Sequence, residues 1–495
     1  MKTTPLAQQS KYAWSLISRA APPKRAAAER VGDYREIYGD YDEATVRAQA
    51  ARCIQCPNAL CMSGCPLSNR IPEWMALTAQ GQFLEAAAVS RATSNLPEIC
   101  SRVCPQERLC EGACILNART DPVAIGAVER FINEYAFRHG GVDVTQAPAN
   151  GRKVAVIGSG PGGLSCADEL AKLGYGVTIF EAQLIPGGLL VNGIPAFKLE
   201  KAVVERRIDL LARRGVEFRL GVRVGWEVSL AGLRDKFDAV FLGVGAQRPK
   251  PIGIPGAELA GIVEALPFLT QKNVDSPLVA GEAIDVRGRR VAVLGGGDTA
   301  MDCLRTALRS GAREAVCLYR RDLANMPGSR KEYANALEEG ARFQFLTNPV
   351  ALVGDAAGRV AGVRCVRMEL GAPDASGRRS PRPVAGSEFL VPADLVLVAY
   401  GFDPVPFPAD SDLATVATDR WGGFRVDENQ MTSLPGVFAG GDSVRGPSLV
   451  VHAVRDARLA AQGIHRYLAA RNSRGPFRRG NPGSGAAEGG TGAPS

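Results

Sequence analysis

Long apolar runs and a secretion signal are both missing from this sequence. No stretch approaches the run of about 18 apolar residues that a membrane-spanning helix requires. The opening residues, MKTTPLAQQSKYAW, lack the apolar core of a signal peptide. We therefore expect a soluble, cytoplasmic protein without a membrane partner.

Histidine and aromatic residues are scarce. The three histidines, His139, His452 and His465, form no cluster, so we expect them at the surface or in packing and not in catalysis. Aromatic residues make up 6% of the chain, and no basic stripe is interleaved with them. The net charge of +8 therefore does not predict a nucleic-acid partner.

Cysteine, in contrast, is plentiful and concentrated. Eight of the 12 cysteines lie between Cys53 and Cys114, spaced C-x2-C-x4-C-x3-C-P and then C-x3-C-P-x4-C-x3-C. A disulfide framework is typical of small secreted proteins, and this chain is long and lacks a signal peptide. Clustered thiolates without histidine favour iron–sulfur clusters. Two zinc sites of four thiolates each, or reduced structural thiols, are the alternatives.

The remainder of the chain carries two nucleotide-binding patterns. The first 150 or so residues indicate helices and cysteine loops. KVAVIGSG, a helical stretch and GVTIFEA then form a β-α-β unit, and RRVAVLGGGDTAMDC opens a second one about 140 residues later. The strand-like runs at 238–245 and 394–401 mark where the chain crosses between the units. The simplest topology inserts the second unit into the first, whose sheet the C-terminal segment completes.

The first unit contains a G-x-G-x-x-G turn formed by Gly158, Gly160 and Gly163. Such glycines allow a tight turn, a close approach of backbone to a pyrophosphate, and contact between helix and strand. Glu181 ends the next strand, where a carboxylate can accept a hydrogen bond from a ribose hydroxyl. The run GVFAGGD ends in Gly441 and Asp442, whose carboxylate suits the ribityl chain of a flavin, so this unit predicts FAD.

The second unit contains the related G-x-G-x-x-A turn of Gly295, Gly297 and Ala300. Its second strand ends in Arg320 and Arg321 instead of an acid, and two guanidinium groups suit a ribose 2′-phosphate. The second unit therefore predicts NADPH, against the alternative that the two arginines are an exposed loop pair. No redox-active C-x-x-C accompanies either unit, which argues against disulfide chemistry of the thioredoxin-reductase kind.

The chain resembles the small subunits of NADPH-dependent glutamate synthases and, more distantly, the N-terminal half of dihydropyrimidine dehydrogenase. The resemblance runs from about residue 30 to 470 and rests on long ordered runs. They include RCIQC, SRVCPQERLCEGAC, GGLLVNGIPAFKLEK, VAVLGGGDTAMDC and YRRDLANMPGSRKE. Within these runs the resemblance adds Gly188, Leu189, Asp298 and Thr299 to the expected cofactor-binding residues.

The resemblance implies two interleaved 4Fe–4S clusters. Cys53, Cys56, Cys61 and Cys114 would hold one of them. Cys65, Cys104 and Cys110 would hold the other, with a fourth ligand that is a glutamine in dihydropyrimidine dehydrogenase. The corresponding stretch here is IGAVERF, which puts Glu129 at that position and leaves Cys100 as a spare thiol.

The fold expected overall is α/β: two Rossmann-like domains, paired as in glutathione reductase, behind a mainly α-helical iron–sulfur domain. We expect the cluster domain at 1–149, the FAD-binding domain at 150–285 and 401–470, the inserted NADPH-binding domain at 286–400, and a disordered tail at 471–495. The resemblance implies that NADPH is oxidised through FAD and that electrons pass through the clusters to the FMN of a large subunit, which makes glutamate from glutamine and 2-oxoglutarate. A differently partnered NADPH oxidoreductase and an iron–sulfur redox sensor are the alternatives.

Overall fold

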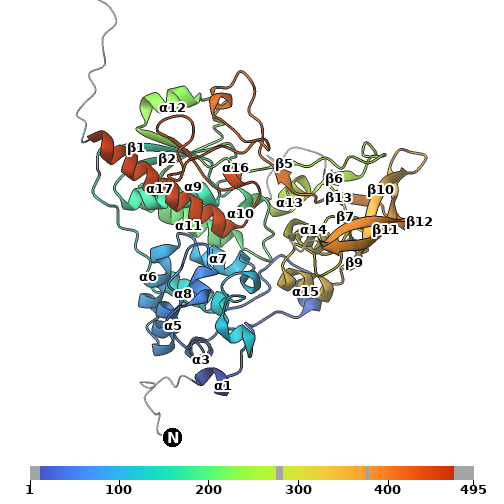
Figure 1. The fold of residues 1–495 in the computed structure, drawn as a ribbon, viewed down its shortest axis with the longest axis horizontal. Coiled ribbons are helices and arrows are strands. Elements are labelled where there is room, and N and C mark those ends of the chain that lie inside the picture. Colours follow the sequence, from blue (N-terminus) through green and yellow to red (C-terminus); the bar gives the residue numbers. More distant parts are fainter. Residues whose placement is uncertain (1–11, 275–282, 374–378, 473–495) are drawn as a thin grey trace, which may run out of the picture.

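The structure is a computed structural model that describes residues 12–274, 283–373 and 379–472. The chain forms three parts (Figure 1): a helical part at the bottom of the view, a first sheet unit at the upper left and a second sheet unit at the right. Within the described residues, no helix is long and apolar enough to cross a membrane. Apart from its first two residues, the tail expected to be disordered lies outside the described residues.

The N-terminal part is helical, as its sequence pattern predicts. Its helices are α1 (Ala13–Leu16), α2 (Ala27–Arg30), α3 (Glu43–Ala51), α4 (Leu60–Ser63), α5 (Ile71–Gln80), α6 (Phe83–Thr93), α7 (Pro97–Val103) and α8 (Ile125–Arg138), with 3-10 turns η1 (Gln106–Arg108) and η2 (Ile115–Ala118). The periodic stretch around Trp74 and Phe83 is two helices, because Gly81 adopts φ +85° and ends α5. Trp74 and Phe83 are both buried in the core of this part.

The first sheet is parallel and has the strand order β15-β4-β1-β2-β3. Its strands are β1 (Lys153–Ile157), β2 (Gly176–Glu181), β3 (Glu217–Leu220), β4 (Ala239–Leu242) and β15 (Val437–Ala439). Its helices are α9 (Pro161–Lys172), α10 (Leu189–Asn192), α11 (Lys201–Arg213), α12 (Leu230–Lys236), α16 (Asp442–Arg445) and α17 (Val450–Asn472), with the 3-10 turn η3 (Asp412–Thr415). Since β15 pairs with β4, the C-terminal segment completes the first sheet as expected.

The second sheet is parallel with the order β6-β13-β7-β8-β9. Its strands are β6 (Ile262–Glu264), β7 (Arg290–Leu294), β8 (Glu314–Tyr319), β9 (Arg342–Phe345) and β13 (Leu395–Val398), and its helices are α13 (Ala265–Asn273), α14 (Asp298–Arg309) and α15 (Arg330–Glu338). The sheet extends beyond the expected limits 286–400, because β6 forms its edge from further back in the chain. Such a short strand, without a glycine turn after it, has no distinct sequence signal.

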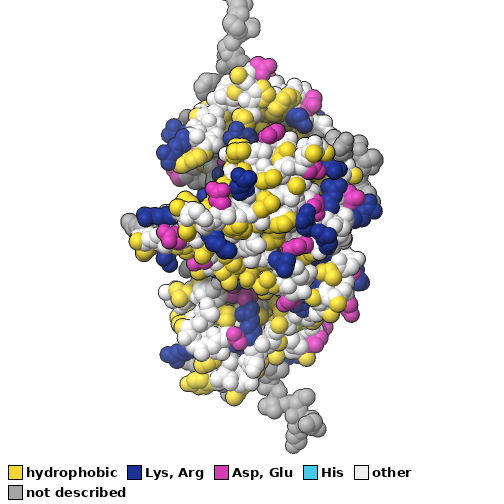
Figure 2. Space-filling view, turned by 90° about the vertical axis from the view of Figure 1, so that its right-hand side faces the viewer, with side chains coloured by type: hydrophobic (Ala, Val, Ile, Leu, Met, Phe, Trp, Pro, Cys, Tyr) yellow, Lys and Arg dark blue, Asp and Glu magenta, His cyan; other side chains and the backbone are white. Residues whose placement is uncertain are grey.

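Two smaller sheets complete the second unit and its connection to the first. β10 (Thr347–Gly354), β11 (Val360–Pro373) and β12 (Arg379–Pro392) form an antiparallel sheet, and β5 (Arg248–Pro249) pairs with β14 (Phe402–Asp403) where the chain crosses between the units. Figure 2 shows the face on this side of the molecule, where Lys and Arg side chains lie among acidic and apolar ones.

Buried ion pairs connect the helical part to both sheet units. Arg207 of α11 binds both carboxylate oxygens of Glu98 on α7, each at 2.7 Å, and both side chains are almost fully buried. Arg30 of α2 reaches Glu339, which follows α15, at 2.8 Å. Breaking such a pair leaves an uncompensated buried charge, so these contacts hold the three parts in one arrangement.

Candidate functional site

The first glycine turn has the geometry expected of a phosphate-binding loop. Gly158 adopts φ +94°, and a Cβ there would lie 2.5 Å from the Gly243 carbonyl oxygen. A Cβ on Gly163 would lie 1.8 Å from the carbonyl oxygen of Gly158, so helix α9 packs directly on the turn. No described atom lies within 4 Å of the Cβ position of Gly160. The turn therefore leaves open backbone at the N-terminus of α9, where a pyrophosphate would fit.

Glu181 lies at the end of β2 beside this turn. Its carboxylate is buried and accepts hydrogen bonds from the Ser159 amide at 2.9 Å and the Ser159 hydroxyl at 2.6 Å. Gly188, with φ +55°, comes against the turn as well, since a Cβ there would lie 2.9 Å from the Gly160 Cα. Leu189 follows as the first residue of α10. The fold thus brings these four expected residues, Gly160, Glu181, Gly188 and Leu189, to one edge of the first sheet.

The C-terminal segment reaches the same edge. The Cβ position of Gly162 lies 4.0 Å from the carbonyl oxygen of Gly440. Gly441, at φ +73°, precedes Asp442, the first residue of α16. Burial raises the pKa of Asp442 to about 7, although its carboxylate accepts a hydrogen bond from the Ser448 amide at 3.1 Å. A desolvated carboxylate with spare acceptor capacity fits a polyol hydroxyl, and the flavin ribityl chain provides such groups.

The second glycine turn repeats the arrangement of the first. Gly295 adopts φ +130°, and a Cβ there would lie 2.3 Å from the Ala399 carbonyl oxygen. The Cβ position of Gly297 has no described atom within 4 Å, and Ala300 is fully buried against the sheet. Asp298 begins α14, where it accepts a hydrogen bond from the Ser329 amide at 2.9 Å, and Thr299 beside it is half-buried. This turn, too, fits a pyrophosphate.

Arg320 and Arg321 follow β8 but differ in environment. Arg320 is exposed, whereas Arg321 is 9% exposed and its Nε has no hydrogen-bond partner among the described residues. The carboxylate of neighbouring Asp322 accepts hydrogen bonds from the backbone and side chain of Asn325 and so takes part in a local turn. Two arginines that have no carboxylate partner among the described residues fit a 2′-phosphate at this edge.

Cys53, Cys56, Cys61 and Cys114 form what we call the first ligand set. The four thiols line one cavity whose remaining wall is apolar and includes Ile71 and Met75. Burial raises the pKa of Cys53 to about 12 and that of Cys61 to about 11. Bound iron would offset this cost, because a positively charged metal stabilises the thiolate.

Cys65, Cys104, Cys110 and Glu129 form the second ligand set. Glu129, on α8, accepts hydrogen bonds at Oε1 from Ser90 at 3.2 Å and Asn69 at 3.3 Å, and its Oε2 accepts none from a described residue. Burial raises the pKa of Glu129 to about 8 and that of Cys65 to about 11. Burial also raises the pKa of Cys110, and the hydrogen bond with Cys100 raises that of Cys104, with the Glu129 charge adding to the shift of all three thiols. The four side chains are therefore close enough to interact electrostatically, and the open carboxylate oxygen of Glu129 suits a metal ligand.

Cys100 lies next to the second ligand set and is buried in the core of the first sheet unit. Its thiol is hydrogen-bonded to that of Cys104, and this bond raises the pKa of Cys104. Among the described residues no three Cys, His, Asp or Glu side chains converge on a point as the ligands of a single metal ion do. A four-iron cluster has no need of such convergence, since each of its ligands bonds a different iron.

Arg108 makes a contact with the second sheet unit that the sequence does not predict. It is the last residue of η1 in the helical part. Its guanidinium group donates a hydrogen bond to the Pro327 carbonyl oxygen at 2.7 Å and lies 4.0 Å from the Asp298 carboxylate. The helical part therefore contacts the second sheet unit at Asp298, directly after the second glycine turn. An arginine inside CPQERLC gives no sequence signal for this role, because only the packing of the parts creates the contact.

Comparison with known proteins agrees with this division. Residues 30–141 match the family described as dihydropyrimidine dehydrogenase domain II, 4Fe–4S cluster, and residues 152–457 match the pyridine nucleotide-disulphide oxidoreductase family. The glutamate synthase (NADPH) small chain of Azospirillum brasilense is 47% identical over 474 residues, which cover 94% of this chain and 98% of that protein. The chain belongs to the glutamate synthase small-chain family.

A relative that carries another name is about as similar to this chain as the glutamate synthase small chain is. The putative oxidoreductase AegA of Escherichia coli is 46% identical over 91% of this chain and 70% of that protein. Among solved structures, Mycobacterium tuberculosis FprA in complex with NADPH superposes with a TM-score of 0.56 at 23% identity, covering 66% of this chain and 86% of FprA, which shows the shared fold.

These matches confirm the family resemblance and the expected fold class. They also confirm, at the level of the family, the kinds of cofactor that the sequence predicted: FAD, NADPH and 4Fe–4S clusters. The individual cofactor-binding residues and metal ligands stay predictions, which the geometry above supports.

Proposed function

We propose that this chain is the electron-input subunit of a glutamate synthase. NADPH would be oxidised at the second sheet unit, and electrons would pass by way of FAD and two 4Fe–4S clusters to the FMN of a large subunit that forms glutamate from glutamine and 2-oxoglutarate. The observation that carries this proposal is that the second ligand set reaches the core of the first sheet unit through Cys104. Cys104 of the second set packs against the core of the first sheet unit, whereas Cys65 and Cys110 pack, like Cys53, Cys61 and Cys114, against the helical core.

The residues of this chain would bind and orient the cofactors. Gly158, Gly160, Gly163, Glu181, Gly188, Leu189, Gly441 and Asp442 would hold FAD; Gly295, Gly297, Asp298, Thr299, Ala300, Arg320 and Arg321 would hold NADPH. FAD supplies the chemistry that links two-electron hydride acceptance to single-electron release. Positioning is the contribution of the protein, so no acid or base of the chain is needed for the hydride step itself.

The first ligand set has a surface that suits a protein partner. Leu60 and Ile115 line its cavity and are 47% and 52% exposed. Neighbouring exposed apolar side chains of this size are typical of interaction sites. We place the contact with the large subunit here, because electrons leaving the first ligand set would then cross the shortest distance.

Mixing the purified chain with its cognate large subunit tests the proposal. Alone, the chain should reduce dyes with NADPH and make no glutamate. With the large subunit, NADPH oxidation should become dependent on glutamine and 2-oxoglutarate. If the two proteins form no complex and the large subunit does not stimulate NADPH oxidation, the proposal is wrong.

A differently partnered NADPH oxidoreductase is the second candidate, because AegA matches this chain almost as well as the glutamate synthase small chain does. A ferredoxin- or pyrimidine-linked acceptor would then replace the large subunit. Identification of the protein that co-purifies from native cells separates these two candidates. An iron–sulfur sensor is the third alternative, and rapid bleaching of the flavin by NADPH would rule it out.

A further inference from the structure

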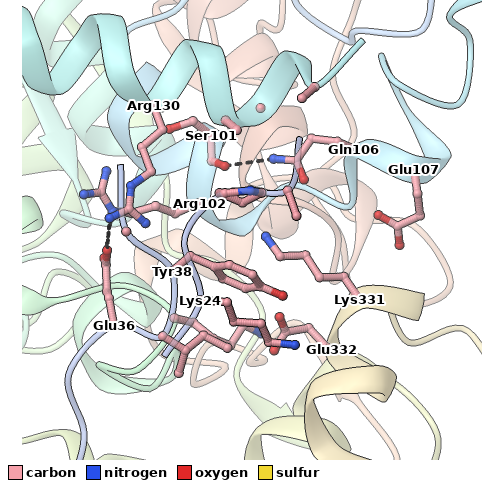
Figure 3. Close-up of a pocket in the computed structure, with 18 of the residues that line it drawn as sticks. Lys24, Glu36, Tyr38, Ser101, Arg102, Gln106, Glu107, Arg130, Lys331 and Glu332 are labelled. Atoms are coloured by element: carbon pink, nitrogen blue, oxygen red, sulfur yellow. Dashed lines mark hydrogen bonds and ion pairs between the residues drawn. The ribbon is translucent and has the colours of Figure 1, made fainter. Parts of the chain in front are cut away.

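A cavity of about 390 Å³ lies where the three parts of the molecule meet (Figure 3). The helical part contributes its N-terminal segment, α7, η1 and α8, the first sheet unit contributes Phe197 and Lys198, and the second contributes the start of α15. The cavity contains neither glycine turn and none of the expected metal ligands. Its volume falls in the range of about 300–1,000 Å³ that is usual for small-molecule sites.

Basic side chains outnumber acidic ones in the cavity lining, with seven Lys or Arg against four Glu. The four glutamates already accept charged hydrogen bonds or backbone hydrogen bonds. Glu36 pairs with Arg102 at 2.7 Å and Glu111 with Arg19 at 2.6 Å. Glu107 accepts from the Ser329 hydroxyl and the Arg330 amide, and Glu332 pairs with Arg305. The acidic groups are therefore committed, and a cationic ligand would find no free carboxylate here.

Lys331 is the exception among the basic groups. It is the second residue of α15, and its side chain extends into the cavity toward Gln106 and Arg102 (Figure 3). Its ammonium group lies 4.2 Å from the centre of the Tyr38 ring and has no hydrogen bond or ion pair to a described residue. Burial lowers the pKa of Lys331, with Arg130 adding to the shift and Glu332, Glu111 and Glu107 opposing it. An ammonium group that faces a cavity and has no bonded anion can pair with an anionic ligand there.

We propose that this cavity binds a small organic carboxylate. The carboxylate group pairs with Lys331, and the carbon skeleton lies against the apolar part of the wall, which includes Ile37, Tyr38 and Phe197. One free ammonium matches one carboxylate better than a phosphate dianion, which would need further donors. This site is independent of the proposed electron acceptor, since it involves none of the cofactor residues.

Ligand binding at this site would stabilise the arrangement of the three parts. Its wall contains residues from all three parts, and the segments that form it also carry Cys104, Cys110 and Glu129. A ligand that binds only the assembled arrangement stabilises it through mass action. Occupancy should therefore raise the unfolding temperature of the holoprotein.

Isothermal titration calorimetry on the anaerobic holoprotein tests the proposal, with succinate, citrate and inorganic phosphate as probes. Succinate or citrate should bind saturably at millimolar concentrations or below. Lys331→Gln should weaken this binding about tenfold or more, because it removes a charge-assisted hydrogen bond. Lys331→Arg should retain binding, and Lys236→Gln, at an exposed position of α12, should leave it unchanged. The carboxylate should raise the unfolding temperature of the wild-type protein and not that of Lys331→Gln.

Lys331→Gln should fold, since the lysine has no described hydrogen-bond partner that the change would leave unpaired, and circular dichroism checks this. Absence of saturable binding by all three probes would overturn the proposal. So would carboxylate binding that Lys331→Gln leaves unchanged. Binding of phosphate alone would overturn the assignment to an organic carboxylate.

Discussion

The two ligand sets differ in composition and in surroundings. The first set has four thiols, three of them from the short stretch Cys53–Cys61, in a cavity with an apolar wall. The second set has three thiols and the half-buried carboxylate of Glu129, and its Cys104 packs against the core of the first sheet unit, while Cys65 and Cys110 pack against the helical core. The sets interleave along the chain, since Cys65 follows the first three ligands of the other set and Cys114 follows Cys110. Sequence proximity therefore does not tell which cysteines share a cluster.

The difference in surroundings gives the proposed electron path a direction. Cys104 lies against the core that carries the first glycine turn, and exposed Leu60 and Ile115 border the first set. Electrons from the flavin would reach the second set first and leave through the first set.

Loss of a first-set ligand should abolish the coupled reaction. In Cys56→Ala, a cluster would lose one of four iron bonds at the exit, so glutamine-dependent NADPH oxidation with the large subunit should disappear. NADPH-dependent dye reduction should persist, because the flavin is untouched. Cys303→Ala, which changes a buried core thiol, is the control and should keep its iron. Wild-type iron content in Cys56→Ala would remove Cys56 from the ligand set.

Removal of the Glu129 carboxylate should damage only the second cluster. Glu129→Ala should lose iron from this cluster and change its EPR signal while the first cluster stays intact. Glu129→Gln, which keeps an oxygen ligand of the same reach, should restore part of the signal. If the iron content and EPR spectrum of Glu129→Ala match those of the wild type, another group is the fourth ligand.

Changes at the coenzyme end should leave both clusters unaffected. Arg320→Ala and Arg321→Ala should each weaken NADPH binding roughly tenfold to a hundredfold and spare NADH, since each removes a charge-assisted bond to the 2′-phosphate. Equilibrium titration with both coenzymes measures this, and Glu181→Ala is the matched control that should loosen FAD and leave coenzyme preference unchanged. Equal weakening of NADPH and NADH would refute the 2′-phosphate role.

A charge at the proposed exit surface should have the smallest effect. Ile115→Glu should weaken binding of the large subunit roughly threefold to tenfold, because it places a carboxylate in an apolar contact. Dye reduction should be unchanged. Leu173→Glu, at a comparably exposed position beside α9, is the control. If both variants bind the large subunit as the wild type does, the contact lies elsewhere.

Much of this arrangement was predictable because it depends on local patterns. The glycine turns, the strand ends at Glu181 and Arg320, and the return of the C-terminal segment to the first sheet all follow from strand–turn–helix signals. The assignment of Cys114 to the same ligand set as Cys53 rests on the family resemblance, since spacing alone suggests two consecutive blocks of four cysteines.

What the sequence did not predict depends on contacts between parts. Arg108 meets the second glycine turn, and Lys331 enters the three-part cavity, only because helices distant in sequence pack together. Neither contact leaves a periodic signal. The break of the Trp74–Phe83 stretch at Gly81 and the early start of the second sheet at β6 are smaller examples, in which a turn or an edge strand overrides the expected boundary.

Freeze-quench EPR during NADPH turnover measures the order in which electrons reach the two clusters. The measurement uses the complex with the large subunit and compares Cys56→Ala with Glu129→Ala. We expect the second cluster to become reduced at the wild-type rate in Cys56→Ala, and the first cluster to stay oxidised in Glu129→Ala. If the first cluster in Glu129→Ala is reduced at the wild-type rate although the second cluster is lost, electrons do not pass through the second cluster first.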